Sequence, residues 1–295
     1  MANTIEVKHA ATAAEFWSLL SPEKPLFQQP CKLLYRGQGD DRWNLTPGVL
    51  RRGMSSTADF QVFKEWAYIE TFVRHCDSIG LPVPNDSPSF REQFLNQNSP
   101  KGPGCGVSEW PPTELHPLMA LAQHYRLPTR LLDWSTRAYV AAYFAISDAL
   151  ARKISRSCCK ESDTDVERLA VWILDIEKRA LFHELKVVAV PGGNNANLAA
   201  QSGRFTLLTQ TGGRGMPFEG EIALDLYFAA QSLPPPLKKV TLPIAEAPAA
   251  LSLCSLYGVT RATLFPDYYG AARATEDALS TPPDKGISLW GFDLK

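Results

Sequence analysis

The sequence predicts an α+β fold, with helices mainly in the first half of the chain packing on a mostly antiparallel sheet. Segments with helical periodicity precede residue 155, and most of the remaining chain consists of short apolar runs of strand length. Breaks with Gly or Pro separate these runs, and the runs do not alternate with helices as a doubly wound sheet requires. No internal repeat or linker is evident, so residues 1–295 are expected to form a single domain.

Four segments of the first half have helical patterns. Helices are predicted at 12–20, 57–77, 113–125 and 135–152. Thr12 stands three residues before Glu15 in a capping-box pattern, and Ser135 is the expected N-cap of the last of these helices. The helix at 57–77 is expected to be amphipathic, with one face that includes Phe60, Phe63, Ala67, Glu70 and Val73.

Two other segments of the first half have different patterns. Residues 31–37, "CKLLYRG", are a short apolar run that ends at a glycine, which predicts a buried strand leading into a turn. Residues 80–112 are rich in Pro, Gly, Ser and Asn, so this segment is expected to be a long loop-rich excursion or a lid.

The second half is mostly strand-like. Strands are predicted for "RLAVWILDI" (168–176), "LKVVAV" (185–190), "RFTLLT" (204–209), "EIALDLYF" (221–228), "LKKVTLP" (237–243) and "RATLFP" (261–266). A helix at about 245–257 is expected between the last two strands.

Composition narrows the class of protein. With 30 basic and 31 acidic side chains the net charge is −1, which disfavours a broad nucleic-acid surface because such surfaces carry a basic excess. No signal peptide and no apolar run of membrane-spanning length is evident. The six cysteines form no C-x-x-C pair and the five histidines are scattered, so we expect reduced thiols, no metal site, no membrane association and a cytoplasmic location.

The first candidate site is "LLYRGQGDDRW", residues 33–43. Arg36 follows a buried apolar run, and a buried guanidinium must be paired or used because its isolated burial is costly. Gly37 allows either a sharp turn or the close approach of a ligand. The alternative is that Arg36 pairs with a buried carboxylate such as Asp133.

The second candidate site is "LPTRLLDWSTRAYVAAYFA", residues 127–145, together with His124 just before it. Arg130 and Arg137 lie near a predicted helix N-terminus, where cations are disfavoured unless an anion such as a pyrophosphate is meant to bind. The alternative is a closed network of these arginines with Asp133. His124 is either an acid or base near neutral pH or a structural residue.

Aromatic residues of the same stretch have two possible roles. Trp134 and Tyr143 can stack on a flat ring of a ligand, or they can belong to the core, which is the commoner role of such residues.

Several motifs together resemble those of the FRG domain, a bacterial family named for its (F/Y)RG motif. They are "YRGQ" (35–38), "QHYRLPTRLLDWST" (123–136), "AAYFA" (141–145), "AQSGRFTL" (200–207) and "LFPDYYGAAR" (264–273). Family members usually carry Gly where Arg126 stands and an acidic residue where Tyr269 stands. A basic residue expected shortly before "AQSG" is replaced in "NNANLAAQ", residues 194–201.

The order of two elements also resembles the R-S-E class of mono-ADP-ribosyltransferases. Arg36 in "YRG" would grip the phosphates of NAD, and Ser135 and Thr136 would shape the nicotinamide side ahead of a helix containing Phe144. With its neighbours Gly37 and Gln38, Arg36 would then belong to an NAD-binding site that also includes Arg130, Asp133, Trp134 and Tyr143. The resemblance implies an ADP-ribosyltransferase-like core.

The third element of that class is a catalytic glutamate, for which the sequence offers three carboxylates. Glu219 and Glu221 have the E-x-E spacing, which on a strand places both side chains on one face. Asp267 in "LFPD" competes with them, or it caps a turn or helix. Gln201 would donate a hydrogen bond to a ligand amide or satisfy a backbone group.

These observations favour an NAD-dependent ADP-ribosyltransferase-like enzyme that modifies a macromolecular acceptor or cleaves NAD, as a toxin or defence effector would. A non-enzymatic sensor that binds a nucleotide or phosphate in the same pocket is the alternative. A third hypothesis makes the charged residues structural and places the function in protein–protein contacts of residues 80–112.

Overall fold

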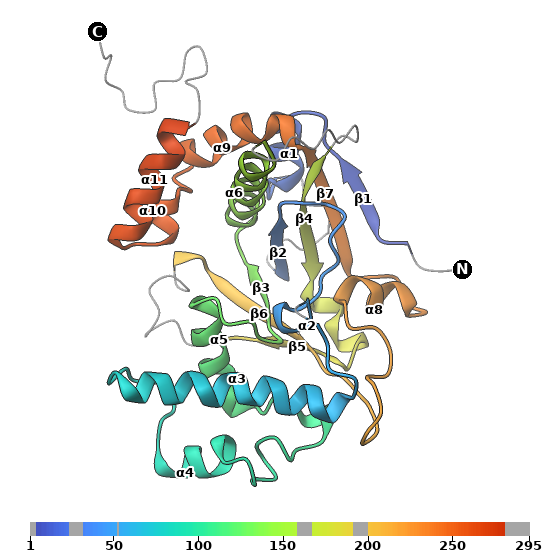
Figure 1. Cartoon of the computed structure of the whole chain (residues 1–295). Helices are drawn as coiled ribbons and strands as arrows, with labels where there is room; N and C mark the ends of the chain where they lie inside the picture. The colour runs from blue at the N-terminus through green and yellow to red at the C-terminus, as the bar shows by residue number, and fades with distance from the viewer. Residues whose placement is uncertain (1–3, 24–31, 52, 158–166, 191–199, 281–295) are drawn as a thin grey trace.

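A seven-stranded, mostly antiparallel sheet organises the computed structural model, within the part of the chain that it describes (Figure 1). The described residues are 4–23, 32–51, 53–157, 167–190 and 200–280. The strand order is β1-β7-β4-β2-β3-β6-β5, and only the pairing of β1 with β7 is parallel. The predicted mostly antiparallel sheet is thus confirmed.

The sheet draws on both halves of the sequence. Its strands are β1 (Glu6–His9), β2 (Leu33–Gln38), β3 (Leu132–Ser135), β4 (Arg168–Asp175), β5 (Leu185–Val188), β6 (Gly203–Leu208) and β7 (Leu237–Pro243). The helices are α1 (Ala13–Leu20), α2 (Gly48–Arg51), α3 (Ala58–Ser78), α4 (Pro88–Phe90), α5 (His116–His124), α6 (Ala138–Ser157), α8 (Leu224–Ala230), α9 (Ala247–Leu256), α10 (Arg261–Leu264) and α11 (Tyr268–Ser280). The expected segregation of helices and strands along the chain is therefore only partial.

The sheet consists of two half-sheets that meet at β2 and β3. Strands β1, β7, β4 and β2 pair along most of their lengths, as do β3, β6 and β5. Between the two groups, Tyr35 of β2 opposite Ser135 of β3 is the one registered pair. In Figure 1, β5 and β6 run across the direction of β2, β4 and β7.

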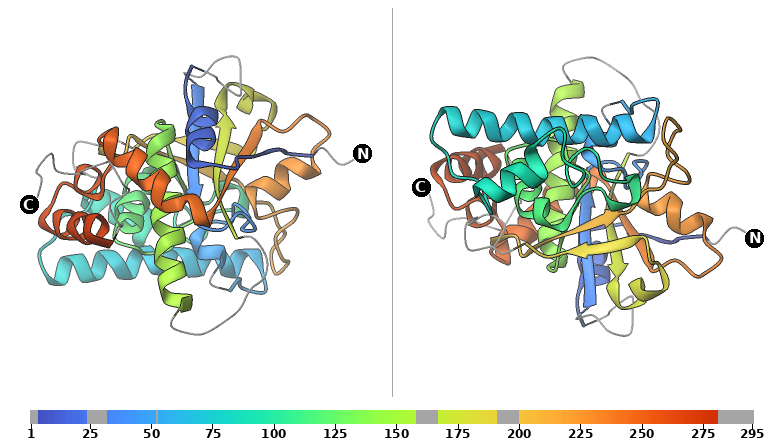
Figure 2. Two further views of the ribbon diagram at one scale, coloured as in Figure 1. Left: turned by 90° about the horizontal axis from the view of Figure 1, so that it is seen from above. Right: turned by 90° about the horizontal axis from the view of Figure 1, so that it is seen from below.

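Two helical layers cover the half-sheets. Helices α1, α6 and α9 bury apolar side chains such as Phe16, Ile146 and Leu251 against β2, β4 and β7. Helices α3 and α5 bury Trp66 and Met119 in a separate cluster with side chains of β5 and β6. Seen from above, α6 and α9 lie on the near side of the molecule, and seen from below, α3 and α4 do (Figure 2).

A third apolar cluster joins the two half-sheets. Leu34 and Trp172 of β2 and β4 pack there with Leu132 and Trp134 of β3. Because β2 and β3 share so few backbone contacts, this cluster supplies apolar burial that helps to hold the half-sheets together.

Gly37 is required by helix packing. A Cβ atom at this position would lie 2.0 Å from Ala141 O and 2.7 Å from Ala145 N, both backbone atoms of α6. The strand continues through Gly37 to Gln38. The expected turn at Gly37 is therefore wrong, and the close approach that glycine permits there is that of α6.

Helix α3 confirms the predicted segment, and Val73 of the predicted apolar face is buried, but the rest of the buried face differs from the prediction. Phe60 and Phe63 are exposed, whereas Gln61, Glu65 and Trp66 are buried. The buried carboxylate of Glu65 has polar partners, described below, which explains why the helix turns a charged residue inward. The spacing of apolar residues in the sequence alone did not indicate which face of α3 is buried.

Residues 80–112 pack beneath α3, and none of them lines the cavity described below (Figure 1). Phe90, Phe94 and Trp110 are buried in the cluster of α3 and α5, and Trp66 Nε1 donates to Phe94 O at 2.9 Å. The segment therefore covers part of that core, and the alternative of a lid is not supported.

Three further segments differ from prediction. Residues 132–135 form strand β3, because Leu132 and Trp134 alternate with Asp133 and Ser135 across the sheet. Ser135 therefore lies at a strand end; its Oγ still accepts a hydrogen bond from Arg137 N at 3.0 Å.

The predicted strands "EIALDLYF" and "RATLFP" are wrong. In α8, helical spacing puts Leu224 and Phe228 on one buried face. Thr260 and Thr263 form a reciprocal capping box around the single turn α10. Local apolar content resembled a strand in both segments, but capping and burial favour a helix.

Among the described residues, no helix combines the length and apolar character that crossing a bilayer would require.

Candidate functional site

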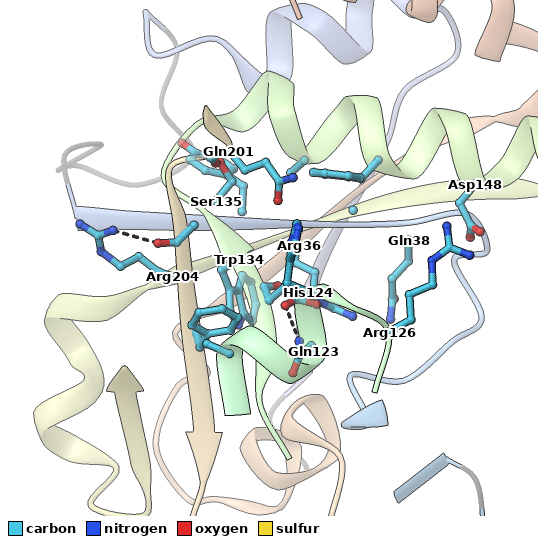
Figure 3. A pocket seen from close by; sticks show the side chains of 18 of the residues that line it. Arg36, Gln38, Gln123, His124, Arg126, Trp134, Ser135, Asp148, Gln201 and Arg204 are labelled. Atoms are coloured by element: carbon cyan, nitrogen blue, oxygen red, sulfur yellow. Dashed lines mark hydrogen bonds and ion pairs between the residues drawn. The ribbon is translucent and has the colours of Figure 1, made fainter. Parts of the chain in front are cut away.

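A cavity of about 550 Å³ opens where β2 and β3 meet, beneath α6 and beside α5 (Figure 3). Of the residues predicted to form a site, eight line it: Arg36, Gly37, Gln38, His124, Asp133, Trp134, Ser135 and Gln201. Volumes of about 300–1,000 Å³ are typical of sites for small ligands and cofactors. Segments far apart in the sequence thus build one site of a suitable size.

Arg36 lies in the middle of the cavity (Figure 3). Its Nη1 donates to Asp133 O at 2.7 Å and lies 3.4 Å from Asp133 Oδ2. The side chain of Arg36 is 13% exposed and that of Asp133 is 59% exposed, so the partner carboxylate is not buried. Arg36 Nε is buried and makes no hydrogen bond to a described residue. The guanidinium is therefore only partly satisfied by Asp133.

Strand β3 provides three consecutive lining residues. Trp134 is buried, and its Nε1 donates to Thr206 Oγ1 at 2.8 Å, which fixes the indole ring. Ser135 Oγ donates to Gln201 O at 2.8 Å. Asp133 also accepts a hydrogen bond from Gln123 Nε2. The cavity wall is thus held in place by bonds to neighbouring strands and loops.

The two predicted glutamines make bonds to the protein itself. Gln38 Oε1 accepts from Trp172 Nε1 at 2.6 Å, and its Nε2 donates to Asn44 O at 3.2 Å. Gln201 Nε2 donates to Leu264 O at 3.2 Å. Both therefore shape the cavity by bracing its walls.

Cationic side chains that the sequence analysis did not select also line the cavity. They are Arg51, Arg126 and Arg204. Arg204 lies at one end of the cavity and Arg126 at the other, with Arg36 between them (Figure 3). With Arg36 they oppose two lining carboxylates, Asp133 and Asp148, so the cavity has a cationic excess that favours an anionic ligand.

Aromatic rings complete the wall. Tyr35, Trp43, Phe144, Phe205 and Phe265 line the cavity together with Trp134. Phe265, Gln123 and Arg204 belong to the motifs that resemble the FRG domain, so the motifs contained a signal for them. Trp43 lies outside those motifs but ends the first candidate stretch, residues 33–43, whereas no sequence pattern indicated Arg51.

Arg126 has an unusual backbone. It follows α5 at φ 67°, with Arg126 N bonded to Gln123 O and Leu127 N to Ala122 O. This is a Schellman termination, whose left-handed position normally holds Gly. A side chain there costs roughly 1–2 kcal/mol, so the Gly usual in family members is physically preferred. Tyr269, the other departure, is exposed and stacks on Arg273; residues 194–199 lie outside the described residues.

His124 also lines the cavity. Partial burial lowers the pKa of its imidazole, against an opposing effect of the nearby carboxylates Asp267 and Asp133. The lowered pKa favours the neutral ring at pH 7, which can accept a proton.

Arg130 does not line the cavity, and its predicted role as a phosphate ligand is not supported. Its Nε and Nη2 donate to the two carboxylate oxygens of Glu65 at 2.9 and 2.8 Å. Trp110 Nε1 and Gln61 Nε2 each donate to Glu65 at 2.9 Å. Arg130 is 1% exposed and stacks over Phe218, so it is a structural residue beneath the site.

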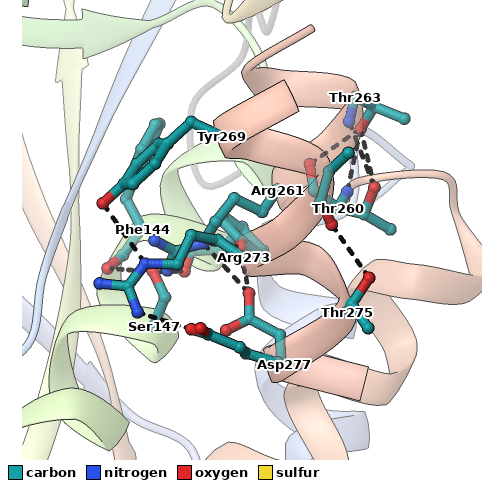
Figure 4. A network of polar contacts seen from close by, with 12 residues as sticks. Phe144, Ser147, Thr260, Arg261, Thr263, Tyr269, Arg273, Thr275 and Asp277 are labelled. Atoms are coloured by element: carbon teal, nitrogen blue, oxygen red, sulfur yellow. Dashed lines mark hydrogen bonds and ion pairs between the residues drawn. The ribbon is translucent and has the colours of Figure 1, made fainter. Parts of the chain in front are cut away.

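Tyr143 and Thr136 also lie outside the cavity wall. Tyr143 Oη donates to Asp277 Oδ2 at 2.8 Å and accepts from Arg261 Nε at 3.2 Å. Burial and the neighbouring carboxylate raise the pKa of Tyr143. This network fixes α10 and α11 against α6 (Figure 4). Thr136 is exposed, and its backbone N–H donates to Ser202 O at 3.2 Å.

The three carboxylates predicted as catalytic do not line the cavity. Glu219 and Glu221 are exposed, and Glu219 pairs its backbone with Thr211 in an isolated bridge ahead of α8. The strand that was to place both on one face does not exist. Asp267 caps α11, with Oδ1 accepting from Gly270 N at 2.6 Å. Its alternative role as a cap is therefore confirmed.

Comparison with known proteins supports the family resemblance. Residues 31–153 match the family model of the FRG domain. No curated protein and no solved structure matches the chain. The matched region contains β2, α5, β3 and most of α6, and thus most of the cavity wall, including Arg36 and Ser135. The family match therefore supports the FRG resemblance over residues 31–153 of the chain.

Proposed function

We propose that this chain binds NAD or a related nucleotide in the Arg36 cavity and acts as an ADP-ribosyltransferase-like enzyme. The observation that carries the proposal is the meeting of Arg36 and Ser135 in one cavity, at the Tyr35–Ser135 pair of adjacent strands. Arg36 offers a buried Nε with no described partner to a phosphate oxygen. Phe144, which lines the cavity and is only partly buried, offers a flat apolar face to a ring of a nucleotide.

The reaction breaks the bond between nicotinamide and C1′ of the ribose. Nicotinamide leaves with the bonding electrons, and the acceptor or water forms the new bond to C1′. The intermediate charge resembles an oxocarbenium ion, which a carboxylate stabilises. Asp133 is the lining carboxylate two residues from Ser135 on the same strand, where alternate side chains share a face. His124 lines the same cavity, and its lowered pKa favours a neutral ring that can take the proton of the attacking group.

The proposed acceptor is a macromolecule of the host, as expected for a toxin or defence effector. The test is to incubate the purified chain with NAD and host lysate, and to follow nicotinamide release and transfer of labelled ADP-ribose. We expect turnover that Arg36→Ala and Ser135→Ala reduce at least about tenfold. Arg36→Lys keeps the positive charge but removes the forked guanidinium donor, so its comparison with Arg36→Ala separates the two contributions. Arg74→Ala is the matched control, because Arg74 is an exposed arginine of α3 paired with Glu70.

A nucleotide-binding sensor is the second candidate. Two observations favour it: Asp133 is engaged by both Arg36 and Gln123, and neither Glu219 nor Glu221 lines the cavity. A rise in melting temperature with NAD, lost in Arg36→Ala but without nicotinamide release, would identify the sensor. Absence of both stabilisation and turnover would refute both functions.

A further inference from the structure

A second cavity of about 280 Å³ adjoins the first. It shares the side chains of Arg36, Arg51, Gln123, Arg126 and Asp133 with the larger cavity, so the two spaces are separated by residues that face both. The volume lies just below the range for a whole small ligand and suits a substituent of one.

The two cavities differ in chemistry. The larger one is lined by aromatic rings, whereas no aromatic side chain lines the smaller one among the described residues. In the smaller cavity three arginines oppose one carboxylate, Asp133, which is itself engaged by Arg36 and Gln123. Rings thus fit the larger space, and a phosphate group fits the smaller one.

Arg126 supplies the second observation. Its left-handed backbone, at φ 67°, is the position after α5 at which Gly is preferred. Within the described residues, its guanidinium makes no hydrogen bond or ion pair, although it lines both cavities. A side chain kept in an unfavourable backbone conformation without a structural partner indicates that its charge serves a ligand.

We propose that Arg126, together with Arg36 and Arg51, forms a second phosphate subsite in the smaller cavity. The site then selects a dinucleotide that carries a phosphate in addition to its pyrophosphate, as NADP does, over NAD. This inference rests on the proposed nucleotide function of the larger cavity and specifies its substrate class.

The test compares the dissociation constants of NAD and NADP by isothermal titration calorimetry, in wild type and in Arg126→Gly. Wild type is expected to bind NADP at least about tenfold more tightly than NAD. Arg126→Gly should lose this preference, because it weakens NADP binding more than NAD binding when the additional phosphate contacts Arg126. The same variant should melt higher by roughly 2–4 °C, because it relieves the left-handed backbone.

Asn85→Gly is the matched control. Asn85 also has a positive φ, of 62°, but it lies in the segment before α4 and lines neither cavity. This variant should leave the affinities for both dinucleotides unchanged. If Arg126→Gly keeps the preference for NADP, or if wild type binds NAD and NADP equally, the subsite is overturned. The proposed function is left intact by either result.

Inorganic pyrophosphate separates the two proposals further. If wild type binds neither dinucleotide, stabilisation by pyrophosphate that is lost in Arg126→Gly supports the anion subsite and refutes the nucleotide function. If wild type binds neither dinucleotide and pyrophosphate does not change its melting temperature, both the nucleotide function and the subsite are refuted.

Discussion

Arg36 and Arg130 differ in the surroundings of the carboxylate that each contacts. The carboxylate beside Arg36 is more than half exposed, so water replaces the guanidinium when Arg36 is removed. The carboxylate beside Arg130 is 3% exposed and already accepts bonds from Gln61 and Trp110. Loss of Arg130 leaves a charge buried without its counter-ion.

We therefore expect opposite effects of two arginine-to-alanine variants. Arg130→Ala should lower the free energy of unfolding by roughly 3–5 kcal/mol, as for a broken buried ion pair. Arg36→Ala should lower it by only about 1–2 kcal/mol, but should abolish ligand binding. Urea denaturation and calorimetry of both variants measure the contrast. Equal losses of stability would mean that Arg36 is a structural residue.

At the residue scale, the sequence was most informative where a residue with suitable chemistry stood inside a recognisable motif. The predicted cofactor-binding residues that stand in dense motif blocks and line the cavity include Arg36, Asp133, Trp134, Ser135 and Gln201; their binding of a cofactor stays a prediction. Arg130 belongs to the same block and yet lies behind the wall. Its partner Glu65 is 65 residues away in sequence, and local patterns cannot reveal such a pairing.

At the scale of elements, the contact between β2 and α6 depends on one missing side chain. Gly37→Ala would place a methyl group against backbone atoms of α6 that cannot move independently of the helix. We expect a loss of about 1–3 kcal/mol or more in the free energy of unfolding, measured by chemical denaturation. Gly48→Ala is the control, because the nearest heavy atom to its added methyl group is 3.6 Å away. Equal stability of wild type and Gly37→Ala would show that the two elements are not tightly packed.

Elements with long-range constraints were harder to predict than elements with a strong local pattern. Strands β4, β5, β6 and β7 and helix α9 were predicted close to their positions, because their apolar runs are long or bounded by clear breaks. Strand β3 has only four residues, and its alternation is hidden beside the helix that follows. Helix α8 was mistaken for a strand because burial of Leu224 and Phe228 is decided by the neighbouring core.

At the scale of the whole molecule, burial of histidines on α5 makes stability depend on pH. Burial lowers the pKa of His116, with added repulsion from Lys186, and burial also lowers that of His124. The unfolded chain binds protons at about pH 6.5, before the folded chain does. The contribution of the two histidines to the free energy of unfolding is therefore fully present above that pH and decreases as pH falls below it.

We expect each histidine to contribute a slope of at most about 1.4 kcal/mol per pH unit between pH 6.5 and 5. Urea denaturation at pH 7.5, 6.5 and 5.5 measures the slope. His116→Gln should flatten it, since glutamine does not titrate. If the free energy of unfolding falls with the same slope in wild type and His116→Gln, the slope does not come from His116.

Tyr35 opposite Ser135 is the one registered pair between the half-sheets, and beyond it the guanidinium of Arg36 bonds to the carbonyl of Asp133. A side chain thus takes the place that a backbone N–H would hold in a continuous ladder. A phosphate that draws Arg36 away from Asp133 would therefore remove a polar contact between the two half-sheets at the place where they share one registered pair.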